Sequence, residues 1–257
     1  MSLTINRTDA IAARPGAVIF DTDNTLYPYD EAHAAAMDAS RRKAMRQLSL
    51  SPAQFDDAYA KARQQIKARL EGTASSHSRL LYFQRMLEIV GLRTQVLLAL
   101  DFEQTYWRVF LTSARLFEGV KDFLDDLRLA GIPTAIVTDL TAQIQFRKIV
   151  YFGLDHYFDY VVTSEEAGFD KPHEASFALT LEKLGDVRRP IWMIGDNPIC
   201  DIQGARTCIG AVTLQKAHAG VKVMDGDAAP DAVFGHFSEL RTLMRRLLER
   251  ETERAAA

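Results

Sequence analysis

Acidic residues, a threonine and a lysine follow short apolar runs of the sequence, at spacings that suit nucleophilic and acid–base chemistry. Residues 21–25 read DTDNT and follow the first run, and residues 195–201 read GDNPICD and close a later one. Between them, Thr138 ends another run and Lys171 precedes a proline. One carboxylate can act as a nucleophile and a second can move protons, while carboxylates close together favour a bound divalent cation.

These residues need elements that bring them together. Continuous apolar runs predict strands that are buried on both faces of a parallel sheet, and they lie at residues 17–20, 132–138, 160–163, 191–195 and 210–214. Helical patterns alternate with the runs from about residue 116 onward, which predicts βαβ units in an α/β fold with helices on both faces of the sheet. Ligands of such sheets bind beyond the carboxyl ends of the strands, so the acids, the threonine and the lysine are expected at one edge.

The stretch from residue 27 to 115 has a different pattern, because it contains no convincing strand. Residues 51–54 read SPAQ, which has the form of a capping box with proline at the first helical position. Helical stripes of apolar residues follow at 55, 59, 66 and 70 and at 80, 83, 87 and 90. We expect an all-helical block over residues 27–115, inserted into a core made of residues 1–26 and 116–257.

Composition narrows the class of protein. The 257 residues carry 31 basic and 34 acidic side chains, a net charge of −3. This balance lacks the excess of positive charge that is typical of proteins that bind a nucleic acid polymer. No apolar run is long enough to span a membrane and the first residues have no apolar signal core, so we expect a cytoplasmic protein. Two cysteines make neither a disulfide framework nor a zinc site.

In this order, the motifs DxDNT, T, KP and GDxxxxD resemble those of the haloacid-dehalogenase superfamily, whose common members are magnesium-dependent phosphatases. The helical block lies where that superfamily places its cap. The resemblance covers the chain from Ala17 to the C-terminal helix and implies a Rossmann-like parallel sheet core with an inserted all-helical cap domain.

The resemblance also implies roles for the acids. Asp21 is implied as the nucleophile that forms an aspartyl-phosphate, and Asp23 as the acid that protonates the leaving alcohol and then deprotonates water. Mg²⁺ is expected between the carboxylates of Asp21 and Asp196, with the backbone carbonyl of Asp23 as a further ligand. Asp201 is expected to support the metal through water or to orient the lysine.

Thr138 and Lys171 are implied as phosphate ligands. Each motif residue also has a structural alternative, such as capping a helix, and for Thr25 we expect only a cap or a turn. In the superfamily, the hydroxyl residue that corresponds to Thr138 is usually followed by asparagine, whereas this chain has Asp139. We expect Asp139 to face away from the phosphate and to cap a helix that begins near Thr141.

Asp23 argues against dehalogenation, because a halide leaving group needs no proton. We expect a phosphatase acting on a small soluble monoester of the nucleotide or sugar phosphate type, in a monomer or homodimer. A phosphomutase and an inactive phospho-responsive binding module remain alternatives. His77 and Arg79, near the polar break at residues 72–78, are candidate substrate contacts, although a solvated loop explains them as well. The remaining histidines are interpreted as surface or packing residues: His33, His156, His173, His218 and His236.

Overall fold

The computed structural model describes residues 3–256 and divides into two compact units, Met1–Tyr27 with Leu116–Ala257, and Pro28–Arg115. We call them the core unit and the helical unit. Residues 1, 2 and 257, which belong to the expected core, lie outside the described part. Of the helices within residues 3–256, none combines the length and apolarity that crossing a membrane requires.

The core unit is built on a seven-stranded sheet in the order β1-β7-β6-β5-β2-β3-β4. Every neighbouring pair is parallel except β1 with β7. The strands are β1 (Thr4–Ile5), β2 (Ala17–Phe20), β3 (Thr134–Thr138), β4 (Tyr160–Thr163), β5 (Ile191–Gly195), β6 (Val212–Lys216) and β7 (Ala232–Phe234). The five predicted strands are present, although β3 begins two residues later than expected and β6 begins and ends two residues later. The α/β fold class predicted from the sequence is confirmed.

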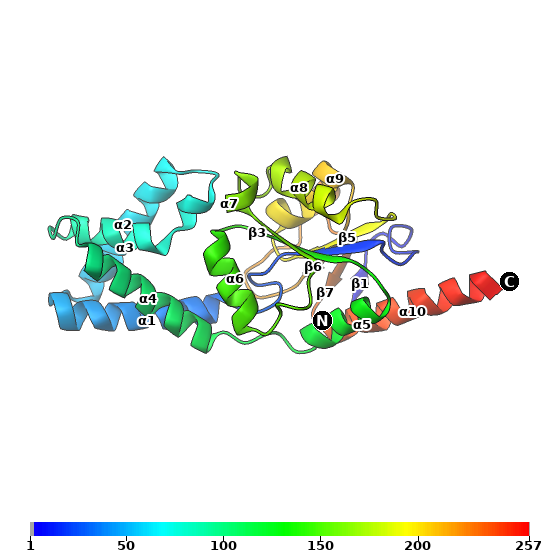
Figure 1. The fold of residues 1–257 in the computed structure, drawn as a ribbon, viewed down its shortest axis with the longest axis horizontal. Helices are drawn as coiled ribbons and strands as arrows, with labels where there is room; N and C mark the ends of the chain where they lie inside the picture. Colours follow the sequence, from blue (N-terminus) through cyan, green and yellow to red (C-terminus); the bar gives the residue numbers. More distant parts are fainter. Residues whose placement is uncertain (1–2, 257) are drawn as a thin grey trace. The chain divides into compact units, whose positions relative to one another are not determined.

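Helices cover both faces of this sheet (Figure 1). They are α5 (Val120–Leu129), α6 (Ala142–Tyr151), α7 (Ser164–Ala167), α8 (Glu174–Leu184), α9 (Gly204–Ile209) and α10 (Phe237–Ala256), with short turns η2 (Pro198–Gln203) and η3 (Gly226–Ala228). On one face, Ala17 and Ile19 of β2 pack in a buried cluster with Phe177 of α8 and Ala205 of α9. On the other face, Phe20 packs edge-on against Phe123 of α5 at a ring distance of 6.2 Å.

The register of the central strands sets the position of the acidic motifs. Phe20 at the end of β2 is the lateral partner of Ile194 in β5 and of Ile136 in β3. The backbone N–H of Asp21 continues this ladder by donating to the carbonyl oxygen of Ile194 at 2.9 Å. The residues that follow β2, β3 and β5 therefore leave the sheet side by side at its carboxyl edge.

The helical unit consists of α1 (Tyr29–Leu48), α2 (Pro52–Arg69), a 3-10 turn η1 (Ala74–His77), α3 (Arg79–Ile89) and α4 (Val96–Ser113). Its core is aromatic, since Tyr59, Phe83, Phe102 and Tyr106 are buried against one another. Helix α1 packs against α4 and helix α2 packs against α3. The predicted capping box is confirmed, because Ser51 and Gln54 exchange both hydrogen bonds at the start of α2.

We predict that Ser51→Ala lowers the free energy of unfolding by about 1 kcal/mol, because the hydroxyl accepts the otherwise unpaired N–H of Gln54. Urea unfolding measures this difference. Ser113→Ala is the control, since Ser113 is exposed at the last residue of α4 and its loss should change stability by less than about 0.5 kcal/mol. Equal effects of the two substitutions would show that the cap contributes nothing.

Candidate active site

The loop after β2 buries Asp21 and occupies both of its carboxylate oxygens. Thr25 donates its hydroxyl to Oδ2 at 2.9 Å, and Lys171 donates from Nζ to Oδ1 at 2.7 Å. A tight turn positions Thr25, because the N–H groups of Thr25 and Leu26 both donate to the carbonyl oxygen of Thr22. The expectation that Thr25 serves only as a cap or turn residue was therefore wrong, since its side chain holds the Asp21 carboxylate.

Lys171 links the acidic residues of the site. Its buried ammonium donates to Asp21 Oδ1, to Asp201 Oδ1 at 2.6 Å and to the carbonyl oxygen of Val137 at 3.1 Å. Burial opposes the charge, but the carboxylates of Asp201 and Asp21 hold the pKa of Lys171 well above its usual value. This lysine stays charged at neutral pH and its three protons point to three fixed acceptors.

Three buried carboxylates meet around this lysine. Oxygen atoms of Asp21, Asp196 and Asp201 all lie within 4.8 Å of one another. Burial, partly offset by Lys171, raises the pKa of Asp21 to about 7. Burial together with repulsion from Asp21 and Asp201 raises the pKa of Asp196 to about 8. Several hard oxygen donors with uncompensated charge fit a small divalent cation, which would relieve the repulsion.

The structure explains the residues of the GDNPICD motif at positions 195–201. Asn197 caps η2, since its side-chain oxygen accepts from the N–H groups of Ile199 and Cys200. The backbone N–H of Asn197 donates to Asp201 Oδ2 at 3.0 Å. A Cβ at Gly195 would lie 2.4 Å from the Cβ of Asp201, so only glycine leaves room for this buried aspartate.

Asp23 has a partner that sequence reasoning missed. Lys148 of α6 donates from Nζ to both oxygens of Asp23, at 2.9 and 3.1 Å, and Tyr27 donates its hydroxyl to the same carboxylate. The Lys148 side chain is 3% exposed, whereas that of Asp23 is 34% exposed and thus accessible to a ligand. A lysine on the helix face that also carries Ile144 and Ile149 was a signal in the sequence, because lysine is rarely buried without a partner.

Thr138 lies beside the nucleophile loop, as its place at the end of β3 suggests. Its hydroxyl oxygen accepts from Gln145 Nε2 at 2.8 Å and lies 2.8 Å from the hydroxyl oxygen of Thr22. Because Gln145 supplies one hydrogen, the Thr138 hydroxyl keeps its own hydrogen for Thr22, for the carbonyl oxygen of Asp139 at 3.5 Å, or for a ligand oxygen.

Asp139 does not cap the following helix, which corrects the expectation from the sequence. Helix α6 begins after Thr141 without a side-chain cap, and the N–H of Ala142 donates to Glu165 instead. Asp139 Oδ1 accepts the backbone N–H of Lys171 at 2.9 Å. Burial raises the pKa of Asp139, so its negative charge is disfavoured there. Its role in the structure is to fix the loop that carries Lys171.

His218 contacts the acidic cluster, although the sequence interpretation placed it on the surface or in packing. Its Nε2 lies 2.9 Å from Asp196 Oδ2, and its Nδ1 lies 3.0 Å from the carbonyl oxygen of Ala219. A carbonyl oxygen only accepts, so Nδ1 carries a hydrogen. The sequence offers no signal for this contact beyond the position of His218 just after β6.

The two candidate substrate contacts lie together in the helical unit. Arg79 begins α3 and donates to the carbonyl oxygen of His77 at 2.6 Å and to the hydroxyl of Tyr29. Its guanidinium lies 5.4–5.6 Å from the centres of three rings, those of Tyr82, Tyr106 and Trp107. The Tyr106 hydroxyl is a further hydrogen-bond partner, so the acceptors given for Arg79 are hydroxyls and a carbonyl. The other predicted site residues gather in the core unit.

Comparison with known proteins agrees with the motifs and the fold. A family model of haloacid dehalogenase-like hydrolases matches residues 15–208. A ribulose-1,5-bisphosphate 5-phosphatase of Halopiger xanaduensis is 37% identical, over 77% of this chain and 83% of that protein. A glyceraldehyde 3-phosphate phosphatase of Methanopyrus kandleri is 27% identical, over 90% and 97%. A phosphatase structure from Thermococcus onnurineus shares the fold, with a TM-score of 0.66, 23% identity and coverage of 89% and 97%.

The role of Asp139 gives a prediction that separates its hydrogen bond from its charge. Asp139→Asn keeps an oxygen that can accept from the Lys171 N–H, and we expect the free energy of unfolding to change by less than about 0.5 kcal/mol. Asp139→Ala leaves that N–H unpaired and should cost about 1–3 kcal/mol. Chemical unfolding of both variants measures the difference, and equal losses would contradict the assigned role.

Proposed function

We propose that this chain, which belongs to the haloacid dehalogenase-like hydrolase family and is a phosphoric monoester hydrolase of it, acts on a small sugar phosphate with the help of Mg²⁺. The observation that carries the proposal is the Lys171 ammonium between Asp21 and Asp201, with Asp196 beside them. The relatives named above act on phosphorylated sugars of three and five carbons, which supports the sugar phosphate class.

Asp21 is the proposed nucleophile. One of its carboxylate oxygens attacks the phosphorus atom, the bond from phosphorus to the ester oxygen breaks, and an aspartyl-phosphate forms. Asp23 gives a proton to the leaving alcohol oxygen and then takes one from water, whose oxygen attacks the same phosphorus. The bond from Asp21 to phosphorus breaks and inorganic phosphate leaves. Lys148 donates to both oxygens of Asp23 and so holds the orientation of this carboxyl group.

The phosphate and the metal need separate sets of ligands. Asp21 and Asp196 are the proposed carboxylate ligands of Mg²⁺, supported by Asp201 and the backbone carbonyl of Asp23, and the bound cation would neutralise negative charge on the phosphate. Thr138 offers its hydroxyl hydrogen to a phosphate oxygen. Lys171 holds the Asp21 carboxylate in place and adds a positive charge near the phosphate.

We propose that residues 27–115 form a helical cap and that this cap contributes to substrate selection. The core motifs recognise phosphate and metal, so discrimination among esters needs other contacts. Arg79 and His77 are the proposed contacts for a polar or anionic substrate group. Support comes from the Arg79 guanidinium, which is held by tyrosine hydroxyls and a carbonyl and forms no ion pair with a carboxylate within the described part of the chain.

We expect Asp21→Asn to reduce turnover by about three orders of magnitude or more, because the amide is a poor nucleophile. A screen of phosphate monoesters with Mg²⁺, including p-nitrophenyl phosphate, identifies the ester to use. Circular dichroism and thermal unfolding check that the variant is folded. Ser113→Ala serves as the control that retains full turnover. Full activity in folded Asp21→Asn protein would end this proposal.

The raised pKa values predict that Mg²⁺ stabilises the protein more as the pH rises. The folded-state pKa values of about 7 for Asp21 and about 8 for Asp196 exceed the ordinary value of 3.8. Without metal, the stability from these groups is therefore full below about pH 4 and is lost as the pH rises through 7 and 8. Magnesium needs ionised ligands, so it competes with protons and restores stability mainly above neutral pH.

Thermal unfolding with and without Mg²⁺ at about pH 6 and about pH 8.5 measures this effect. We expect the increase in Tm on adding Mg²⁺ to be clearly larger at the higher pH. Asp196→Asn should remove most of the response at both pH values. An increase that is the same at both, or that persists in this variant, would contradict the assignment of the metal ligands.

A further inference from the structure

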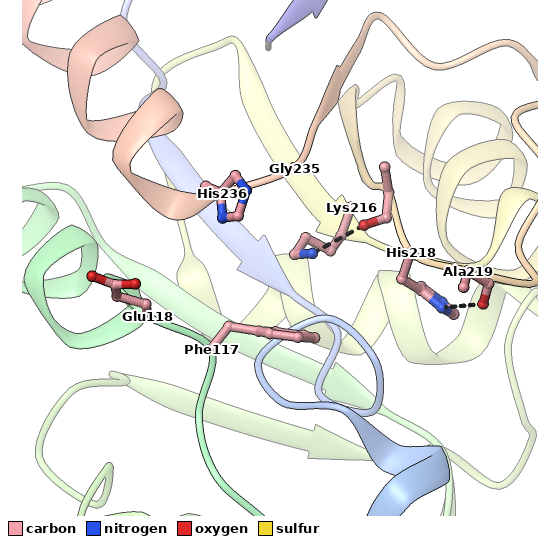
Figure 2. A pocket seen from close by; sticks show the side chains of 8 residues that line it. Phe117, Glu118, Lys216, His218, Ala219, Gly235 and His236 are labelled. Atoms are coloured by element: carbon pink, nitrogen blue, oxygen red, sulfur yellow. Dashed lines mark hydrogen bonds between the residues drawn. The ribbon is translucent and has the colours of Figure 1, made fainter. Parts of the chain in front are cut away.

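A cavity of about 460 Å³ lies in the core unit beyond the carboxyl ends of β6 and β7 (Figure 2). Its lining includes Phe117, Glu118, Lys216, His218, Gly235 and His236. The proposed chemistry leaves this cavity unused. One lining residue, His218, reaches the acidic cluster through its contact with Asp196.

Lys216 gives the cavity a buried positive charge. The residue is 4% exposed, its Nζ donates to the carbonyl oxygen of Ala217 at 3.0 Å, and Nζ lies 4.2 Å from the centre of the Phe117 ring. Figure 2 shows the amino group between the rings of His236 and Phe117. Among the side chains that the structure describes, no carboxylate forms an ion pair with Lys216. Burial lowers its pKa, and the carboxylates of Glu239 and Asp196 offset this effect only in part, so a bound anion would offset it further.

Two helices begin beside the cavity, and the start of α5, which has no side-chain cap, adds to its positive potential. Helix α5 has 10 residues and follows Phe117 and Glu118, and helix α10 has 20 residues and follows Gly235 and His236. Their starts touch, because a Cβ at Gly119 would lie 3.3 Å from the Cβ of Phe237. Helix N-termini favour negative groups. The Glu239 carboxylate already accepts the N–H of Gly235 at 2.9 Å, and Glu118 is exposed at the rim.

The cavity lies two strands away from the nucleophile loop in the sheet. Strand β5 lies between β2 and β6, with Phe20 opposite Ile194 and Ile194 opposite Leu214. Asp21 comes one residue after Phe20 and Lys216 two residues after Leu214, so the backbones of Asp21 and Lys216 are two strand spacings apart laterally, about 10 Å. A phosphorylated sugar of a few carbons can span that distance.

We propose that this cavity binds a second phosphate group, carried by the end of the sugar opposite to the one hydrolysed at Asp21. The inference rests on the proposed function and narrows the substrate class to sugar bisphosphates. The Lys216 ammonium holds the distal phosphate together with the start of α5. The Phe117 ring gives the carbon chain an apolar surface.

Kinetics with a matched pair of esters, ribulose 1,5-bisphosphate and ribulose 5-phosphate, test this inference. We expect the wild-type protein to favour the bisphosphate in kcat/KM. Lys216→Met should reduce that preference about tenfold or more, mainly by raising KM for the bisphosphate. Lys216→Arg should retain much of the preference because it keeps the charge. Lys222→Met, an exposed lysine a few residues away, is the control that leaves the preference unchanged.

Three results would overturn the inference: no preference in the wild-type protein, equal losses for both esters in Lys216→Met, or loss of the preference in Arg79→Met but not in Lys216→Met. The last result would place the distal phosphate in the helical unit. Hydrolysis of p-nitrophenyl phosphate by the same proteins reports the proposed function separately. If no ester is hydrolysed, calorimetric titration of the bisphosphate into Asp21→Asn, with and without Lys216→Met, still decides whether the cavity binds it.

Discussion

The site depends on one buried ammonium group, that of Lys171, which holds two carboxylates and a carbonyl oxygen at 2.6–3.1 Å. Removing Lys171 would leave buried carboxylates without compensation, which proteins rarely tolerate. The surroundings serve this contact. Asp139 fixes the lysine's backbone, and Gly195 leaves the space that Asp201 occupies. The DxD, KP and GDxxxxD motifs are therefore parts of a single hydrogen-bonded network rather than separate ligands.

The parallel sheet makes this network possible because its strands hold the charged groups in fixed positions. Strands β3, β2 and β5 are lateral neighbours although more than 100 residues separate the first two in sequence, and each is buried along its length. Apolar burial of these strands stabilises the unit and holds the ends of the strands in a fixed register. The charged groups are then presented by rigid elements, so the carboxylates stay close together despite their repulsion.

The strands, the fold class and the capping box could be predicted because each depends on local patterns of residues. Strands β1 and β7 were missed, since two or three residues give no readable run. The contacts of Asp139, Lys148 and His218 were misjudged or missed for a different reason. Each joins elements that are distant in the sequence, and the direction of a side chain in such a contact depends on tertiary packing. Spacing along the chain predicts which strand end a residue follows, but not which neighbour it faces.

The charges of the cluster support the proposed metal without reference to any relative. Asp21, Asp196 and Asp201 bring three negative charges when ionised, and Lys171 brings one positive charge, which leaves an excess of two. Asp23 does not change this excess, because Lys148 pairs with it. Two protons can neutralise the excess, and the raised pKa values of Asp21 and Asp196 describe that state. One divalent cation neutralises it equally well and leaves the carboxylates ionised, which is the form in which Asp21 can attack phosphorus.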